Sequence, residues 1–137
     1  MMDIIYKTEK SLNPIEFIDV LKRSTLSERR PVNDFERVEK MCRNSNLIIT
    51  ARLNEKLIGV ARSVTDFVYC TYLSDLAVDK EFQHKGIGKR LIEETKKQTP
   101  QATLILLSAP AAIEYYPKIG MKKHEHCFIL KEINELK

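Results

Sequence analysis

One segment of the chain places glycines and positive charge at the start of a predicted helix. Gly86-x-Gly88 follows a short polar loop and precedes a run with helical spacing. Glycines let the main chain approach a bulky ligand, and the unpaired N–H groups of a helix N-terminus favour an anion. Lys85, Lys89 and Arg90 add positive charge at the same place. The segment therefore predicts a binding site for a pyrophosphate-type group.

Two common phosphate-binding patterns do not fit this segment. The P-loop pattern GxxxxGK[ST] fails because one residue separates Gly86 from Gly88 and Arg90 follows Lys89. The dinucleotide pattern GxGxxG fails because Leu91 stands where the third glycine belongs. A lone GxG also leaves a second interpretation open, a tight turn that leads into a helix.

The elements that must position this loop follow from the spacing of apolar residues. A helix start is predicted at Asn13-Pro14-Ile15-Glu16, where Asn caps and Pro takes the first turn. Asn54-Glu55 joins two β-rich runs and predicts a hairpin. Strands are expected over residues 3–7, 46–52, 56–64, 69–78, 104–107 and 121–131, and further helices over 34–43, 86–98 and 109–116. This order predicts an α/β (α+β) chain with one mixed sheet and helices on both faces.

Length, composition and charge limit the number of domains and the class of protein. The chain has 137 residues, which is one domain's worth, so a single domain over residues 1–137 is expected. Apolar residues make up 43% and charged residues 31%, which excludes collagen-like and wholly disordered chains. The net charge of +4 fits either simple solubility or a local basic site, and the total does not separate the two.

The cysteines give no sign of a disulfide framework or a zinc ribbon. Cys42, Cys70 and Cys127 are odd in number and widely spaced, without a CxxC pair. His124, His126 and Cys127 form an H-x-H-C cluster, but a metal site needs three or four ligands and no further cluster supplies them. We expect a polar face near the C-terminal edge of the sheet here, and no metal.

Reduced thiols and the apolar profile together predict a cytoplasmic protein. The first seven residues hold no long apolar run typical of a signal peptide. No apolar run approaches the roughly 20 residues that a membrane span needs. We therefore expect neither a signal peptide nor an anchor, and no membrane partner.

Two signatures resemble one known family. Gln83-x-x-Gly86-x-Gly88, directly after the strand residues Leu76-Ala77-Val78, resembles the coenzyme A loop of the GCN5-related N-acetyltransferase superfamily. Residues 112–121 (AIEYYPKIGM) resemble the second signature of that family, a small-residue helix that ends in an aromatic-Tyr pair followed by Gly. Together with the element order, the resemblance covers essentially the whole chain. It implies the acyl-CoA N-acyltransferase fold, with a mostly antiparallel sheet of six to seven strands.

The resemblance also implies where acetyl-CoA, the co-substrate, would bind. The pantetheine arm would lie beside Leu76, Ala77 and Val78, and N–H groups near Ala77 and Val78 would polarise the thioester carbonyl. The pyrophosphate would rest on the amides of Gln83, His84, Lys85, Gly86, Ile87, Gly88 and Lys89.

For proton transfer, the resemblance implies a general acid but gives no clear general base. Tyr116 matches the family's usual general acid, which protonates the departing thiolate, and its alternative is a packed aromatic in a helical stripe. Family members often place the general base at positions that match Tyr72 and Ser74, and neither is a good base. Asp75 is adjacent, but strand alternation points it away from Tyr72 unless a bulge rotates it. A water relay is the other candidate.

The predicted function is transfer of the acetyl group of acetyl-CoA to an amine of a small molecule or protein. Its alternative is a non-catalytic coenzyme A-binding sensor or partner module on the same fold. Nucleic-acid binding is not expected, because the basic residues of the predicted helix are interleaved with acidic ones at i, i+3 and i+4. A homodimer remains open.

Acceptor selection is expected from segments before the glycine loop. Arg62 stands in an otherwise apolar strand and either lines the acceptor cleft or faces solvent. The resulting mixed acidic and basic lining does not identify one amine. The residues considered for it are Arg29, Arg30, Asn33, Asp34, Arg62, Asp66 and Tyr72.

Overall fold

An open sheet of five strands, in the order β1-β2-β3-β4-β5, forms the centre of the described chain. The computed structural model describes residues 3–137, and the chain divides into two compact units, one ending at Leu107 and the next beginning at Ser108. The first unit contains β1 (Ile4–Glu9), α1 (Pro14–Arg23), η1 (Leu26–Arg29), α2 (Phe35–Arg43), β2 (Leu47–Leu53), β3 (Lys56–Thr65), β4 (Cys70–Val78), η2 (Lys80–Phe82), α3 (Ile87–Gln98) and β5 (Thr103–Ile105). The second contains η3 (Pro110–Ala112), α4 (Tyr115–Lys118) and η4 (Ile133–Glu135).

Strands β1 to β4 pair antiparallel, and β5 joins β4 in parallel. The β2–β3 hairpin turns at Asn54 and Glu55, whose φ angles are 50° and 68°. Two consecutive residues with positive φ form the type of turn that suits the right-handed twist of a hairpin. The hairpin predicted at these two residues is confirmed.

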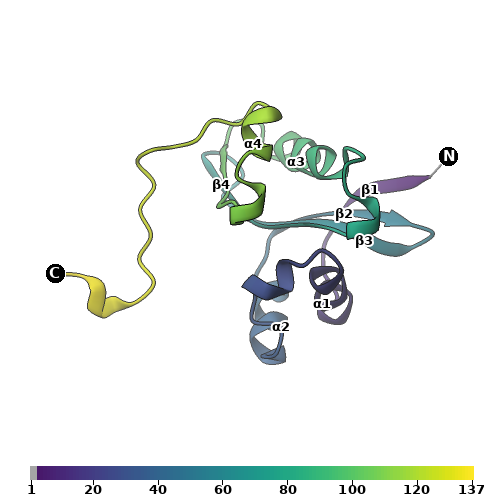
Figure 1. The fold of residues 1–137 in the computed structure, drawn as a ribbon, viewed down its shortest axis with the longest axis horizontal. Coiled ribbons are helices and arrows are strands. Elements are labelled where there is room, and N and C mark those ends of the chain that lie inside the picture. The colour runs from purple at the N-terminus through teal and green to yellow at the C-terminus, as the bar shows by residue number, and fades with distance from the viewer. Residues whose placement is uncertain (1–2) are drawn as a thin grey trace. The chain divides into compact units, whose positions relative to one another are not determined.

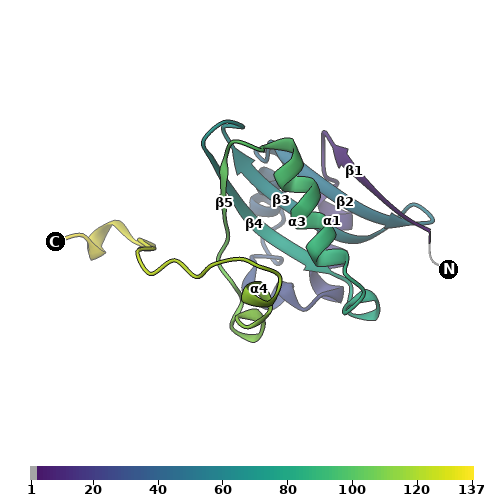
Figure 2. The same ribbon diagram turned by 90° about the horizontal axis from the view of Figure 1, so that it is seen from above.

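Helices cover both faces of the sheet, as predicted. Helices α1 and α2 lie on one face and α3 lies on the other (Figure 1). Phe17 and Val38 bring α1 and α2 into one buried cluster with the strands, whereas Leu91 brings α3 into a second cluster on the opposite face. Figure 2 shows α3 lying over the strands on this face. Each face of the sheet therefore has its own apolar core.

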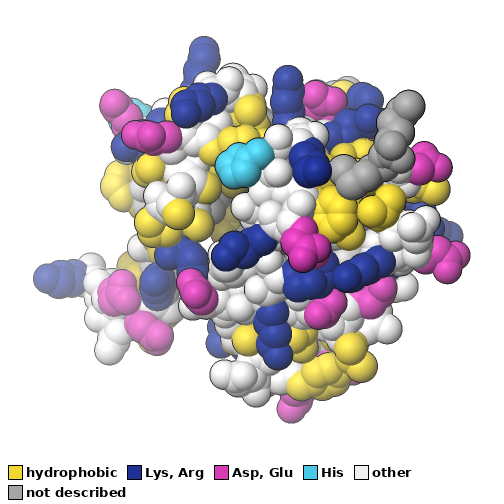
Figure 3. Space-filling view, turned by 45° about the vertical axis from the view of Figure 1, so that its right-hand side comes forward, with side chains coloured by type: hydrophobic (Ala, Val, Ile, Leu, Met, Phe, Trp, Pro, Cys, Tyr) yellow, Lys and Arg dark blue, Asp and Glu magenta, His cyan; other side chains and the backbone are white. Residues whose placement is uncertain are grey.

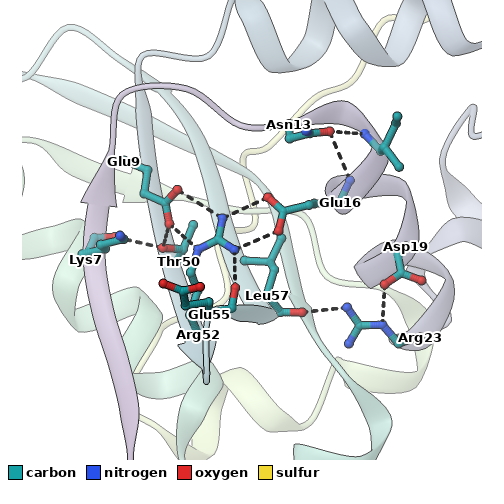
Figure 4. A network of polar contacts seen from close by, with 11 residues as sticks. Lys7, Glu9, Asn13, Glu16, Asp19, Arg23, Thr50, Arg52, Glu55 and Leu57 are labelled. Atoms are coloured by element: carbon teal, nitrogen blue, oxygen red, sulfur yellow. Dashed lines mark hydrogen bonds and ion pairs between the residues drawn. The ribbon is translucent and has the colours of Figure 1, made fainter.

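The start of α1 follows the predicted capping pattern. The Asn13 side chain accepts hydrogen bonds from the N–H groups of Ile15 at 2.8 Å and Glu16 at 3.4 Å. Arg52 on β2 then bonds both Glu9 of β1 and Glu16 of α1 (Figure 4). These hydrogen bonds, with Glu16 contributing most, raise the pKa of Arg52. The network fixes the first turn of α1 to the sheet.

The expectation of six to seven strands is wrong, since the sheet of residues 3–137 has five. The run over 104–107 contributes only β5, Thr103–Ile105, and the run over 121–131 forms no strand. A strand forms only when its main chain pairs with a neighbour, so apolar β-formers alone do not make one. The helix expected over 109–116 is two short helices, η3 and α4.

The histidine cluster lies in this non-strand region of the second unit. A turn at Glu125 and His126 brings the His126 N–H within 3.0 Å of His124 Nδ1. The two rings meet edge to face with centroids 5.5 Å apart. The expected polar face at a sheet edge is therefore wrong, because the sheet has no strand here. No group of three or more metal-ligating side chains occurs within residues 3–137, and no helix there is long and apolar enough to cross a membrane.

Candidate active site

The glycine-containing loop begins at Asp79, directly after the end of β4, and hydrogen bonds hold Asp79 in place. The Asp79 N–H donates to the Ile58 carbonyl at 2.8 Å, and its carboxylate accepts from the Glu81 N–H at 2.9 Å. Arg23 of α1 forms an ion pair with the same carboxylate and also donates to the Leu57 carbonyl at 2.6 Å (Figure 4 shows the second bond). Burial alone would raise the pKa of Asp79, but the Glu81 N–H and the Arg23 guanidinium bring it below its ordinary value.

Gln83 closes the loop back onto the strand. Its side-chain Nε2 donates to the Val78 carbonyl at 2.9 Å. His84 and Gly86 then adopt left-handed conformations, with φ of 64° and 82°. A Cβ built at Gly86 would meet no atom within 4 Å, so glycine is required there for its backbone conformation rather than for space. The Gln83 side chain thus has a structural role within the loop.

Helix α3 begins at Ile87 without a side-chain cap. The first N–H groups of a helix have no acceptor inside it, so those of Ile87, Gly88 and Lys89 are available to an anion. The Lys85 and Lys89 side chains stand exposed beside them. On the face drawn in Figure 3, Lys and Arg side chains are interspersed with Asp and Glu rather than forming one basic surface.

The Arg90 side chain is engaged elsewhere. Its Nε donates to Glu94 at 2.9 Å, and its guanidinium lies over the Tyr6 ring of β1, 4.7 Å from the centroid. This ion pair and stacking contact direct Arg90 along the helix and toward β1. The positive charge offered at the helix start is therefore that of Lys85 and Lys89.

Gly59 on β3 positions the first turn of α3. A Cβ at Gly59 would stand 3.2 Å from Ile87 Cγ2, 3.2 Å from Leu91 Cδ1 and 3.4 Å from Ala51 Cβ. The helix start packs directly on the strand because this residue has no side chain. Sequence reasoning missed this role. A glycine inside an otherwise β-branched and apolar run was the available signal.

Near this loop, β4 is paired with a strand on one side only among the described residues. Strand β5 pairs with Cys70, Thr71 and Tyr72 of β4. Within the described residues the remainder of β4, up to Val78, pairs with β3 alone. The main chain around Leu76, Ala77 and Val78 therefore has one edge on which an extended ligand can add hydrogen bonds as a further strand would.

A bulge at Ser74 changes the direction of the side chains along β4. Arg62 of β3 pairs with Asp75, but the next β3 residue, Ser63, pairs with Leu73, so Ser74 has no partner on β3. One extra residue reverses the face to which the following side chains point. Leu73 consequently packs on the α3 side, and Asp75 points to the side of α1 and α2.

This bulge settles the orientation of Asp75. Regular alternation would place Asp75 and Tyr72 on opposite faces of the sheet, but here they share a face. Tyr72 pairs with Val64 and Asp75 pairs with Arg62, and Val64 and Arg62 lie on the same side of β3. The Asp75 side chain is fully buried, and its two oxygens accept separately from the Nε atoms of Arg30 and Arg62. A buried carboxylate between two arginines does not suit a general base.

Tyr116 belongs to the second unit, in the short helix α4. Its carbonyl accepts from the Met121 N–H at 3.0 Å, and its ring meets that of Tyr115 edge to face. Burial raises the pKa of Tyr116, and the neighbouring Tyr115 adds to the effect. The assignment of Tyr116 as general acid stays a prediction.

Comparison with known proteins adds independent evidence on the family of this chain. The sequence model of the acetyltransferase (GNAT) family matches residues 15–121 of this chain. An uncharacterised N-acetyltransferase, ycf52, from Pyropia yezoensis is 30% identical over 139 residues, covering 84% of this chain and 77% of the relative. A GNAT family protein of Streptococcus pneumoniae TIGR4, SP0256, aligns with a TM-score of 0.75 at 19% identity, covering 95% of this chain and all of the other.

A further solved structure, an aminoglycoside N-acetyltransferase AAC(6')-Iy in complex with CoA, aligns with a TM-score of 0.73 at 13% identity over 97% of each chain. These structural alignments show that the fold is shared. A glycine loop that leads from a strand into a helix, a strand that parts from its neighbour beside it and a match over most of the sequence agree: the chain belongs to the GNAT family of acetyltransferases.

Proposed function

We propose that this protein transfers the acetyl group of acetyl-CoA directly to an amine. The observation that carries the proposal is the junction between β4 and α3. There the left-handed Gly86 exposes the uncapped N-terminus of a 12-residue helix beside the unpaired edge of the strand. A helix start favours the pyrophosphate, and a strand edge favours an extended chain with amide groups. Coenzyme A contains both in sequence.

The residues that would hold acetyl-CoA fall into two groups. Leu76, Ala77 and Val78 would hydrogen-bond the pantetheine arm through their main chain. The loop and helix start would hold the pyrophosphate through the amides of Gln83, His84, Lys85, Gly86, Ile87, Gly88 and Lys89. The Lys85 and Lys89 side chains contribute charge at the same place.

The reaction needs a proton to leave the amine and another to reach the sulfur. The amine nitrogen forms a C–N bond with the thioester carbonyl carbon, the C–S bond breaks, and coenzyme A leaves as a thiolate. Main-chain N–H groups near Ala77 and Val78 would stabilise the oxyanion. Tyr116 would protonate the thiolate, because a phenol, with an ordinary pKa of about 10, carries its proton at neutral pH. With Asp75 buried between arginines, a water relay is the proposed route for the amine proton.

The acceptor is proposed as an amine of a small molecule or a peptide. One structural neighbour is named as an aminoglycoside acetyltransferase in complex with sisomicin, and one relative from Glycine max is named as a histone acetyltransferase. Both substrate classes therefore occur among similar proteins. Another relative is named as chloroplastic, and the cytoplasmic location and the homodimer stay predictions.

Two measurements test the proposal together. Release of coenzyme A thiol from acetyl-CoA is followed across a panel of amines, and coenzyme A binding is measured by calorimetry. The proposal expects both binding and amine-dependent thiol release. Tight binding without turnover on any amine would instead support the non-catalytic coenzyme A-binding module.

A further inference from the structure

Arg30 and Arg62, two of the charged residues that the sequence placed in the acceptor lining, have structural roles. Arg62 neither faces solvent nor offers a free charge, since it is 7% exposed and paired with Asp75. Its guanidinium also donates to Ser45 Oγ at 2.9 Å and Ser74 Oγ at 3.0 Å. Arg30 pairs with the same Asp75 and donates to the Ser74 carbonyl at 2.9 Å. Both arginines therefore hold the β4 bulge in place.

The acidic residues of the predicted lining are engaged in the same way. Asp66 accepts from the N–H groups of Val68, Tyr69 and Cys70 at 2.8–3.0 Å, which lowers its pKa and organises the tip of the β3–β4 hairpin. Asp34 caps α2 by accepting from the Arg37 N–H at 3.1 Å. These carboxylates already accept hydrogen bonds in a local turn and a helix cap. They are therefore poorly placed to bind the additional ammonium groups of a polycationic acceptor.

Apolar side chains remain next to the bulge. Val64 pairs with Tyr72 across β3 and β4, and Tyr72 pairs with Ile105 across β4 and β5. Paired residues point to the same face of a sheet, so the three side chains form one row, which we call the acceptor row. Their exposed fractions are 49%, 38% and 52%, although each is a large apolar group on a strand.

The acceptor row lies on the face of the sheet that α1 and α2 cover elsewhere. Val64 follows Arg62 by two residues on β3, and the Arg62 guanidinium faces α1, 5.9 Å from the centroid of the Phe17 ring. Tyr72, the middle residue of the row, is the last β4 residue that pairs with β5, and it lies two positions before the bulged Ser74. The row thus reaches the point where β5 stops pairing with β4, next to the strand edge on which the proposed function places the pantetheine arm.

We propose that the acceptor row binds the apolar body of the acceptor, so that the preferred substrates are monoamines on an aromatic or branched aliphatic body rather than polycations. This inference rests on the proposed function. An aromatic ring that stacks on Tyr72 and contacts Val64 and Ile105 buries apolar surface on both sides. A polyamine gains no comparable apolar contact from this row, and Asp75 near it is already paired with Arg30 and Arg62.

The test compares amines and variants in the same thiol-release assay. Phenethylamine and isoamylamine represent the proposed class, and spermidine and kanamycin represent polycations. Tyr72→Ala should raise the KM for phenethylamine by about tenfold, with kcat and the coenzyme A Kd changed less than twofold. Tyr72→Phe should keep the wild-type KM, because the contact is apolar. Tyr69→Ala is the matched control, since Tyr69 is 79% exposed at the hairpin tip outside the row.

The possible outcomes separate this inference from the function on which it rests. A higher kcat/KM for spermidine than for phenethylamine, or equal effects of Tyr72→Ala and Tyr69→Ala, overturns the inference and leaves acetyl transfer intact. If no amine is acetylated, the proposed function fails. Ligand-observed NMR of phenethylamine with the coenzyme A-saturated protein then tests whether the acceptor row binds this amine. Binding that Tyr72→Ala abolishes supports the inference, and binding that is unchanged in Tyr72→Ala, or undetectable in wild type, overturns it.

Discussion

Substitution of Gly59 tests whether the packing of α3 on β3 sets the geometry of the glycine loop. An added Cβ would stand 3.2 Å from side-chain carbons of Ile87 and Leu91, a few tenths of an ångström inside ordinary van der Waals contact. Alanine regains about 0.5–1 kcal/mol of backbone entropy, which offsets part of the overpacking cost of about 1–3 kcal/mol. We expect Gly59→Ala to destabilise by at most about 2.5 kcal/mol, and Gly59→Val by about 2–3 kcal/mol.

The same substitution should weaken coenzyme A binding. Ile87 is the first residue of α3, so a shift that relieves the clash moves the N–H groups of Ile87 and Gly88. We expect a loss of about 1 kcal/mol in binding for Gly59→Val, which is about fivefold in Kd. Urea denaturation gives the stability, and calorimetry with coenzyme A gives the Kd.

A control separates displacement of the helix from general instability. Leu73→Ala removes a buried side chain from the same core cluster, and should cost about 2–5 kcal/mol by leaving a cavity. Because it does not push on Ile87, it should leave the coenzyme A Kd within twofold of wild type. Equal Kd values for Gly59→Val and wild type, with the valine variant measurably destabilised, would refute the argument that Gly59 positions the loop.

Three further predictions concern the carboxylates and Tyr116. The folded-state pKa of Asp79 lies below its ordinary value of 3.8, so its contribution to stability is present above that pH and is lost as the pH falls through the folded-state value; Asp79→Asn should flatten the acid limb of unfolding free energy against pH. Asp75→Asn leaves two arginines without their carboxylate and should cost about 3–5 kcal/mol in urea denaturation. Tyr116→Phe should lower kcat by about 10²–10⁴-fold with the coenzyme A Kd nearly unchanged, as measured by thiol release and calorimetry.

Each of these has a contrary result. An acid limb that is as steep in Asp79→Asn as in wild type would show that this carboxylate does not carry the pH dependence. A loss below about 1 kcal/mol for Asp75→Asn would mean that the arginines find other partners. An unchanged kcat in Tyr116→Phe would remove the phenol from proton transfer.

Much of the fold follows from short-range patterns. Asn13 caps α1 through N–H groups two and three residues away, and Asn54 with Glu55 turns the β2–β3 hairpin. The strand predicted over 121–131 shows the limit of such reasoning, because this segment forms no strand. A strand requires a partner edge, and a sequence pattern does not supply one.

The candidate site divides along the same line. The sequence alone predicted a glycine-containing loop that leads into a helix, and the structure has both, with a left-handed Gly86 before the uncapped start of α3; the binding role of Gln83 to Lys89 stays a prediction. The sequence also predicted the strand that leads into the loop. It did not show that the Gln83 side chain bonds the Val78 carbonyl, nor that Arg90 turns toward Tyr6.

The sequence by itself thus determined the glycine loop, the helix it opens and the strand before it, because each depends on interactions between near neighbours. Tertiary structure alone decided the bulge at Ser74, the burial of Arg62 and the orientation of Asp75. Arg62 and Arg30 reach Asp75 from 13 and 45 residues away, and Arg23 reaches Asp79 from 56 residues away. Such contacts exist only once the strands are paired and the helices packed, and they decide which side chains remain exposed for an acceptor.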